Sequence, residues 1–162
     1  MPVKSLLSPQ VKAILDEAVS QELYASHLYK HVANQCQRLG YFGAQKFFAS
    51  ESADELEHYQ LHADYQNDRG ATAAIPSLPA ITDKVASFRA AIELGYETEV
   101  ELGEKYADWY ARSDVTTQQF LLQFIEIQRK SIGEYGDLIS RLDRSGDDEC
   151  GIIIIDQELG AK

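Results

Sequence analysis

Acidic and imidazole side chains at helical spacing are the residues of this chain with the clearest capacity for chemistry. Glu55 and His58 stand three positions apart, a spacing that on a helix directs a carboxylate and an imidazole toward one metal ion. Glu22, Glu99 and Gln128 lie on the apolar stripes of three further helical segments. We therefore expect all five side chains to meet inside one protein core.

Such a grouping predicts a bound metal ion. Burying several carboxylates together is very costly unless a positive charge compensates them, and a divalent cation is the simplest compensation. A ligand set rich in carboxylates, with one or two imidazoles and no thiolate, suits iron or manganese better than structural zinc. The sequence thus favours an iron or manganese site near the middle of the helices.

Simpler interpretations exist for each residue taken alone. A single Glu-x-x-His spacing is common by chance and is usually a solvated pair. His62, one turn after His58, is more often a surface or hydrogen-bonded histidine, and Gln128 is most often a polar surface residue. Glu99 belongs to a run of acidic residues of the kind that usually forms a solvated face. We favour the metal site because four separate segments each place a carboxylate or amide near their midpoint.

Glycine and proline divide the chain into long helical segments. Ser8 is a suitable N-cap with Pro9 as the first helical residue, and Gly40 follows the last residue of this segment. Apolar residues recur at helical spacing in each of the later segments. We predict helices over about residues 9–39, 42–69, 83–112 and 115–143, and a short fifth helix over 151–159.

These segments predict an all-α, single-domain chain over residues 1–162. Helices of ~28 residues would be ~40 Å long, and helices of that length need mutual burial, so an antiparallel four-helix bundle is the expected architecture. The connection over 71–82 contains Pro76 and Pro79 and is long enough to cross the bundle from end to end. The second and third helices should therefore run in the same direction.

Composition excludes several other classes of protein. A net charge of −11 argues against a nucleic-acid partner, which needs a basic surface. The longest apolar run, Ile152 to Ile155, is far too short for a membrane span, and the N-terminus does not have the pattern of a secretory signal. Cys36 and Cys150 form no metal-binding spacing and are predicted to be free thiols in a reducing compartment. We expect a cytoplasmic protein.

The chain resembles the ferritin family. The motifs that carry the resemblance span nearly the whole chain: Glu22-Leu23-Tyr24-Ala25-Ser26 followed by Tyr29, Asp54-Glu55-Leu56-Glu57-His58, Asn67-Asp68-Arg69-Gly70, Gln128-Arg129-Lys130-Ser131 and Asp156-Gln157-Glu158-Leu159-Gly160. The last of these resembles the short fifth helix of bacterial ferritins, whereas Gln128-x-x-Ser131 resembles the fourth helix of animal ferritins. The chain is thus similar to non-haem bacterial ferritins with an animal-like fourth helix.

The resemblance implies an oligomer of 24 subunits that forms a hollow shell and stores ferric mineral. It also implies a ferroxidase centre in each bundle, where O2 or H2O2 oxidises Fe(II). By motif, Glu22, Glu55 and His58 match the ligands of one iron, with Glu55 bridging to a second iron at Gln128. Tyr29 matches the family's tyrosine near the centre, a candidate electron donor.

Further residues are implied as secondary sites or are lacking. Asp54 and Glu57 resemble acidic residues that face the cavity and collect iron, and Glu51 and His62 are candidates for secondary or alternate metal contacts. Bacterioferritins bind haem through a methionine in mid-chain, but Met1 is the single methionine here. We therefore predict no haem.

The carboxylate that the third helix contributes is the point of departure from the family pattern. An alignment without gaps puts Gly95 where the family usually has a glutamate, whereas a gap of two residues would match Glu97. Glu99 lies one turn beyond Gly95 on the same face, and we predict that Glu99, together with His62, supplies the second iron site. In a simpler alternative, Gly95 makes room for a neighbouring side chain.

An incomplete second site defines the main alternative function. The chain would then be a shell subunit that stores or nucleates iron without fast oxidation. A DNA-protecting mini-ferritin and a purely structural bundle are weaker alternatives. The first is disfavoured because its metal site lies between subunits, whereas Glu22 and Glu55 point to a site within one bundle.

Overall fold

Four long helices and one short helix make up the structure, a computed structural model that describes residues 1–162. Their bounds are α1 (Pro9–Leu39), α2 (Phe42–Asp68), α3 (Phe88–Ala111), α4 (Val115–Ser145) and α5 (Glu149–Gly160). The predicted all-α four-helix bundle with a short fifth helix is confirmed. None of the helices is both long enough and apolar enough to cross a lipid bilayer.

Local sequence accounts for most of the helix ends. The Ser8 hydroxyl accepts a hydrogen bond from the Val11 amide at 3.2 Å, and Gly40 ends α1 with a φ of +88°, a left-handed conformation that favours glycine. The predicted start of the third helix at 83 is wrong, because the helix begins at Phe88. The Ser87 side chain caps it by accepting from the Ala90 amide.

Two further ends, the end of α4 and the start of α5, each differ from the prediction by two residues. Helix α4 continues to Ser145 because Gly146, with a φ of +66°, is the first residue in the left-handed conformation. Helix α5 begins at Glu149 rather than at residue 151, and the Asp148 carboxylate caps it by accepting from the Gly151 amide at 3.1 Å.

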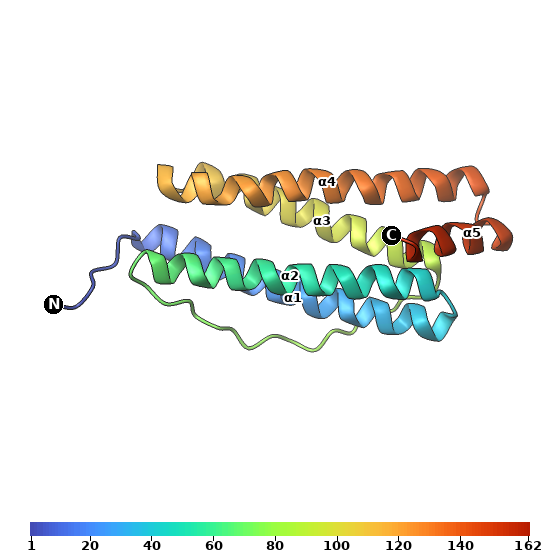
Figure 1. Cartoon of the computed structure of the whole chain (residues 1–162), viewed down its shortest axis with the longest axis horizontal. Coiled ribbons are helices and arrows are strands. Elements are labelled where there is room, and N and C mark those ends of the chain that lie inside the picture. The colour runs from blue at the N-terminus through green and yellow to red at the C-terminus, as the bar shows by residue number, and fades with distance from the viewer.

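The segment between α2 and α3 follows the length of the bundle. In Figure 1 this segment runs beneath α1 and α2 from one end of the molecule to the other, so that α3 starts beside the end of α1. The observed connection spans 69–87 and is therefore longer than the predicted 71–82. As predicted, α2 and α3 run in the same direction.

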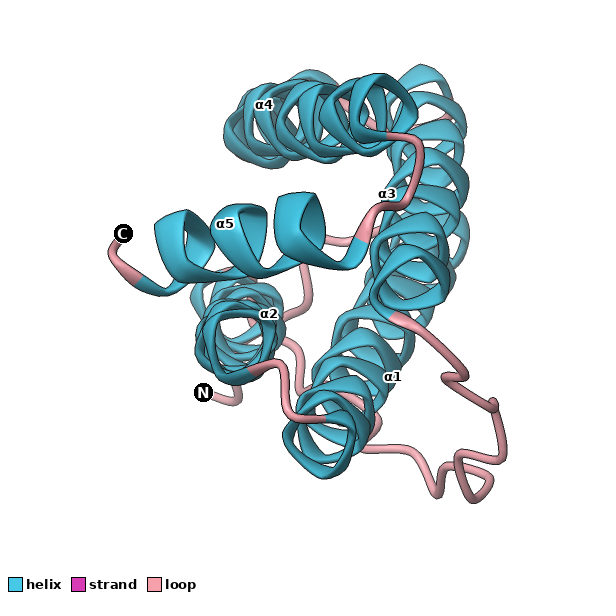
Figure 2. Cartoon of the chain, turned by 90° about the vertical axis from the view of Figure 1, so that its right-hand side faces the viewer, coloured by secondary structure: helices cyan, strands magenta, loops and turns pink.

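Helix α5 crosses one end of the bundle between α2 and α4 (Figure 2). It also supplies a cap that α2 lacks, since Tyr41 makes no capping hydrogen bond with its side chain. The Asp156 carboxylate accepts from the amides of Gly43 at 3.1 Å and Ala44 at 2.7 Å. A negative charge at the start of a helix is favourable, so this contact fixes α5 to α2.

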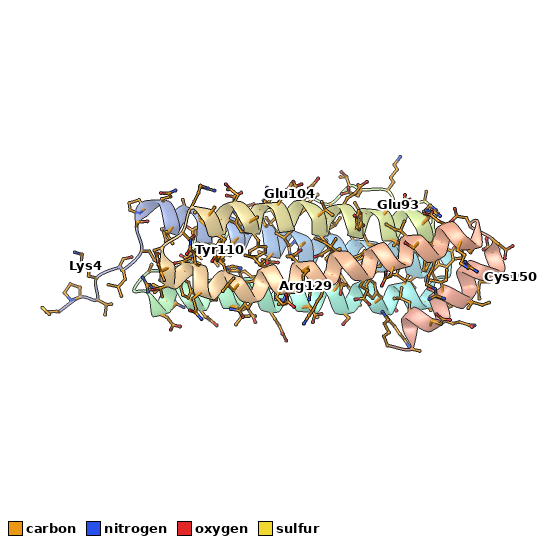
Figure 3. The ribbon with its side chains drawn as sticks, turned by 90° about the horizontal axis from the view of Figure 1, so that it is seen from above. Lys4, Glu93, Glu104, Tyr110, Arg129 and Cys150 are labelled. Atoms are coloured by element: carbon orange, nitrogen blue, oxygen red, sulfur yellow. The ribbon has the colours of Figure 1, made fainter.

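Side chains fill the space between the long helices (Figure 3), and the buried apolar side chains form two clusters. The larger cluster lies toward α5 and includes Tyr29, Phe48 and Tyr135. The smaller cluster lies toward the start of α1 and includes Tyr106 and Trp109. Neither cluster contains the buried polar residues, which are Glu22, Ser26, Glu55, His62, Gln66, Glu99, Thr117, Gln128 and Asp156.

Candidate metal centre

Glu22, Glu55 and His58 form a compact group of potential metal ligands. Glu22 has no exposed surface and Glu55 is 4% exposed, and the apolar residues around them on α1 and α2 hold them inside the bundle. One ligand atom from each of the three lies within 4.8 Å of the others. His58 Nδ1 is 2.9 Å from Glu55 Oε2 and 3.8 Å from Glu22 Oε2. The sequence prediction that these three side chains meet is therefore confirmed.

The pKa values of this group reflect the crowding of charge in a buried place. Burial raises the pKa of Glu55 well above its usual range, and the adjacent Glu22 raises it further. Burial lowers the pKa of His58, but the neighbouring carboxylates of Glu22 and Glu55 outweigh this effect and raise it to about 10. Because the pKa values of Glu55 and His58 are both raised, these two groups hold protons more tightly in the metal-free chain than they would in water. Metal binding must displace such protons.

Glu99 and Gln128 provide a second set of oxygen atoms in the same layer. Glu99 is fully buried and Gln128 is 3% exposed, and the Tyr29 hydroxyl donates to Glu99 Oε1. Burial and the charge of Glu55 raise the pKa of Glu99 to about 7, although Tyr29, His58 and Gln128 oppose the rise. The charge of Glu55 therefore acts on Glu99, although Glu99 is not among the three residues whose ligand atoms lie within 4.8 Å of one another.

Unpaired oxygen atoms test whether this layer suits a cation. Glu22 Oε2, Glu99 Oε2 and Gln128 Oε1 are buried and make no hydrogen bond. Buried acceptors without a partner are costly, and here three occur together in one layer of the bundle. Divalent cations that take hard oxygen ligands would give these acceptors a partner, so the residues present fit a metal centre.

The structure distinguishes between the candidate positions on α3, which are Gly95, Glu97 and Glu99. Glu97 is exposed and lines a surface pocket of about 270 Å³ with Tyr24, so it does not face the bundle interior. A Cβ atom on Gly95 would lie 2.3 Å from Tyr135 Cε1. Gly95 is thus a space-making residue, as the simpler alternative had it, and Glu99 is the carboxylate that α3 brings into the core.

The candidate secondary residues are distributed more widely. His62 is fully buried, but its Nε2 lies 2.7 Å from the Tyr106 hydroxyl, so its hydrogen bond goes to Tyr106 rather than to Glu99. Glu51 is half-buried and accepts from the Tyr135 hydroxyl at 3.2 Å. Asp54 and Glu57 are exposed on the outer face of α2. Neither contributes to the buried group.

Two tyrosines beside the centre were not singled out from the sequence. Tyr106 donates to Glu22 Oε1, and Tyr135 lies next to Tyr29 and donates to Glu51. Each stands seven residues after a polar residue of the central layer, Glu99 or Gln128. Seven residues correspond to two helical turns on the same face, and this spacing is the signal that would have found them.

Comparison with known proteins gives the family of this fold. A family model described as a ferritin-like domain matches residues 12–145. A probable bacterial non-heme ferritin-like protein of Haemophilus influenzae is 27% identical over 159 residues, which is 96% of each chain. A ferritin of the crayfish Pacifastacus leniusculus is 29% identical over 153 residues, covering 90% of this chain and 84% of that one.

Solved structures show the same architecture. An open-pore ferritin from the hyperthermophilic archaeon Archaeoglobus fulgidus superposes with a TM-score of 0.92 at 22% sequence identity. The superposition covers 96% of this chain and 99% of the archaeal chain. The fold is therefore shared over nearly the whole length of both chains.

Proposed function

The chain belongs to the ferritin family, and from this premise we propose that it oxidises Fe(II) to Fe(III) at a di-iron ferroxidase centre within each subunit. The product would be stored as ferric mineral inside a hollow shell, in the cytoplasm. The observation that carries the proposal is the convergence of Glu22, Glu55 and His58 within 4.8 Å. The unpaired oxygens of Glu22, Glu99 and Gln128 in the same layer support it.

The two iron ions would be bound with different strength. Glu22, Glu55 and His58 would bind the first Fe(II), and Glu55, Glu99 and Gln128 would bind the second, with Glu55 shared. Anionic oxygen ligands stabilise Fe(III) more than Fe(II), because the interaction grows with the charge of the ion. Oxidation is therefore favoured at this site once a suitable acceptor of electrons is present.

The electron balance fixes what else the reaction consumes. Each Fe(II) loses one electron, so a pair of ions supplies two electrons to one O2, which takes up two protons and becomes H2O2. With H2O2 as the oxidant, the same two electrons and two protons give two molecules of water. We further propose Tyr29, whose hydroxyl donates to Glu99, as an electron donor: with one Fe(II) bound, Tyr29 would supply the second electron that O2 takes up and would lose its phenolic proton with it.

The experiment is to mix the assembled, iron-free protein with two Fe(II) per subunit in air and follow the ferric absorbance by stopped flow. The proposal expects a fast phase that saturates at two Fe(II) per subunit. A fast phase is expected to disappear in Glu55→Ala, because Glu55 serves both ions. Slow oxidation equal to that of Fe(II) in buffer would instead support the alternative, a shell subunit that stores iron without fast oxidation.

One observation favours the alternative of a shell subunit that stores iron without fast oxidation. Helix α4 brings an amide and a hydroxyl, Gln128 and Ser131, where a stronger second site would have a carboxylate or imidazole. Sedimentation velocity on the same preparation would determine whether 24 subunits assemble. Assembly together with iron uptake but without the fast phase would identify the storage-only subunit.

A further inference from the structure

A repeated spacing relates the two halves of the bundle. Each long helix carries a polar residue of the central layer and, seven residues later, a second polar or aromatic residue on the same face. The four pairs are Glu22 and Tyr29 on α1, Glu55 and His62 on α2, Glu99 and Tyr106 on α3, and Gln128 and Tyr135 on α4. Antiparallel packing of the two helix pairs therefore places these residues in an approximately two-fold arrangement.

The hydrogen bonds follow this two-fold arrangement. Tyr29 of α1 donates to Glu99 Oε1 of α3, and Tyr106 of α3 donates to Glu22 Oε1 of α1. In each glutamate the other oxygen, Oε2, is buried and has no hydrogen-bond partner. The two tyrosines thus do the same thing at the two carboxylates, since each occupies one oxygen and leaves the other for a metal ion.

His62 stands behind Tyr106. Its Nε2 is 2.7 Å from the Tyr106 hydroxyl, and its ring stacks on Phe124 with a centroid distance of 4.3 Å. Because the single hydroxyl hydrogen of Tyr106 goes to Glu22, the hydroxyl oxygen must accept from His62. His62 therefore carries its hydrogen on Nε2, and its Nδ1 is the nitrogen that remains buried without a partner.

These hydrogen bonds run in one direction, from the imidazole of His62 to the carboxyl group of Glu22. Nε2–H of His62 donates to the Tyr106 oxygen, and the hydroxyl of Tyr106 donates in turn to Glu22. Hydrogen bonds in such a chain strengthen one another inside a protein. Burial, reinforced by the charge of His58, lowers the pKa of His62 to about 3, so the imidazole adds a donor without adding a second positive charge beside the metal ligands.

We propose that Tyr106 and His62 are a positioning pair that holds Glu22 as a one-oxygen ligand, with Oε1 fixed by the pair and Oε2 directed to the metal. The inference rests on the proposed function, because Glu22 must be a metal ligand. Groups that orient a ligand in this way commonly change metal affinity by about 10- to 100-fold when they are removed. The pair therefore controls how tightly the first ion is held.

Cobalt(II) is the probe of choice, because it binds oxygen and nitrogen ligands and its visible absorption reports coordination without any oxidation. We expect Tyr106→Phe to weaken binding of the first Co(II) by about 10-fold or more and to change its visible spectrum, since Glu22 could then bind through both oxygens. Tyr110→Phe is the matched control. Tyr110 lies one turn further along α3 (Figure 3), and its hydroxyl makes no hydrogen bond.

Two variants of His62 separate positioning from packing. His62→Leu fills the space but cannot donate to Tyr106, and we expect it to shift the Co(II) affinity and spectrum in the same direction as Tyr106→Phe. His62→Gln can still present an N–H, and we expect it to keep the wild-type spectrum. If neither Tyr106→Phe nor His62→Leu alters the affinity or the spectrum of the first Co(II), the positioning role is overturned.

Failure of the underlying proposal gives a different result. If the wild-type protein binds no Co(II), the metal centre itself is wrong and the positioning role falls with it. If the wild-type protein binds Co(II) but Tyr106→Phe and His62→Leu both bind it with the wild-type affinity and spectrum, only the positioning role is wrong. Melting curves of every variant show whether the bundle remains folded, as is expected for Tyr106→Phe because the ring contacts with Trp109 and Phe124 stay in place.

Discussion

The α1–α2 pair and the α3–α4 pair place polar residues at matching positions but with different chemistry. The first pair contributes two carboxylates and an imidazole, Glu22, Glu55 and His58, whereas the second contributes one carboxylate, Glu99, and the amide of Gln128. Glu22 of α1 and Glu99 of α3 each accept a hydrogen bond from a tyrosine hydroxyl of the other helix. The frame is therefore nearly symmetric, and the asymmetry lies in the donors that α2 and α4 supply.

In the proposed centre, this difference would give two metal sites of unequal strength within one fold. The backbone and the tyrosines set where the carboxylates point, and this geometry is shared by both halves. The charge and softness of the remaining donors then set the affinity. A strong first site would retain an ion while a weaker second site exchanges it, which suits a centre that must release its product for storage.

The largest effect is expected from a change at His58, the residue that most distinguishes the α1–α2 pair from the α3–α4 pair. His58→Ala removes the imidazole that distinguishes the first half from the second. Removal of a direct ligand should cost more than the loss of a group that merely orients one, so we expect the initial rate of Fe(II) oxidation to fall by at least about 100-fold. Stopped-flow absorbance at two Fe(II) per subunit measures it.

His27→Ala is the control, because His27 is exposed on α1 and lies outside the buried group. It should oxidise iron at the wild-type rate. A His58→Ala rate within a few-fold of that control would mean that the imidazole does not bind the first ion. The asymmetry between the halves would then have no role in oxidation.

Substitution of Gly95 tests whether the packing of α3 against Tyr135 requires a residue without a side chain. Gly95 stands four residues before Glu99, where α1 has Ala18 four residues before Glu22. A Cβ on Gly95 would lie 2.3 Å from the fully buried ring of Tyr135, so Gly95→Ala must displace that ring. We expect a loss of about 1–3 kcal/mol in the free energy of unfolding, measured by chemical denaturation at fixed protein concentration.

Gly133→Ala provides the opposite expectation on the neighbouring helix. Nothing lies within 4 Å of a Cβ at Gly133, which is exposed. Alanine is the better helix former by up to ~1 kcal/mol, so this variant should be as stable as the wild type or more stable. Equal stability of both variants would show that Tyr135 yields without cost and that α3 does not require glycine at residue 95.

A third prediction concerns variants in which α4 carries the same metal-binding residue types as α2. Ser131 stands three residues after Gln128 and is half-buried, so the two share a face of α4 as Glu55 and His58 do on α2. The double variant Gln128→Glu with Ser131→His should tighten binding of the second Co(II) by about 10-fold, equivalent to ~1.4 kcal/mol. Calorimetric titration of the metal-free protein measures both sites.

The matched control moves the new imidazole to the outer face. Gln128→Glu with Arg129→His introduces the same residue types, but Arg129 is exposed and bonded to Glu126. It should show the effect of the carboxylate alone. If both double variants bind the second ion equally, the residue at 131 does not face the site.

The periodicity of apolar residues was enough to predict which face of each helix is buried. The stripe of α3 through Phe88, Gly95, Glu99 and Trp109 is buried as the spacing of apolar residues predicted, because a helix has one period and one buried face. The start of α3 could not be placed in this way, since both Asp83 and Ser87 are acceptable caps. The choice depends on how the long connection leaves the bundle.

Contacts between helices are the part that could not be predicted. The spacing predicted that Glu99 and His62 would lie at the same level, but His62 pairs with Tyr106 and Glu99 with Tyr29. A helical repeat fixes the direction of each side chain and not its partner across the core. Partners depend on the relative rotation of helices and on which donors remain unpaired.

The smallest expected effect is a pH dependence of the free energy of unfolding in the metal-free protein. Burial raises the pKa of Glu51 to about 8 and that of Glu99 to about 7, from a usual value of 4.5. Between pH 6.5 and 8 the folded chain thus holds protons that the unfolded chain has released. The free energy of unfolding should therefore decrease as the pH rises through this window.

The half-buried His58 and the fully buried His62 further define the pH window. His58, whose pKa is raised from 6.5 to about 10, contributes in the same direction, because the folded chain keeps its proton above pH 6.5. His62, whose pKa is lowered to about 3, destabilises the fold only as the pH falls below 6.5. Urea denaturation of the metal-free protein at pH 6.5 and pH 8 should hence show the lower stability at pH 8.

Glu51→Gln isolates one part of this effect, because the new amide would keep a hydrogen-bonding group beside Tyr135 without a carboxylate. We expect this variant to lose less stability between pH 6.5 and 8 than the wild type does, whereas Glu57→Gln, at an exposed position on the same helix, should behave as the wild type. Addition of Co(II) should reduce the slope in both, since the metal takes the place of the protons at Glu55, His58 and Glu99. A stability that rises from pH 6.5 to pH 8 would mean that these carboxylates are ionised in the empty bundle, and that the two halves hold their charges apart without a proton or a metal between them.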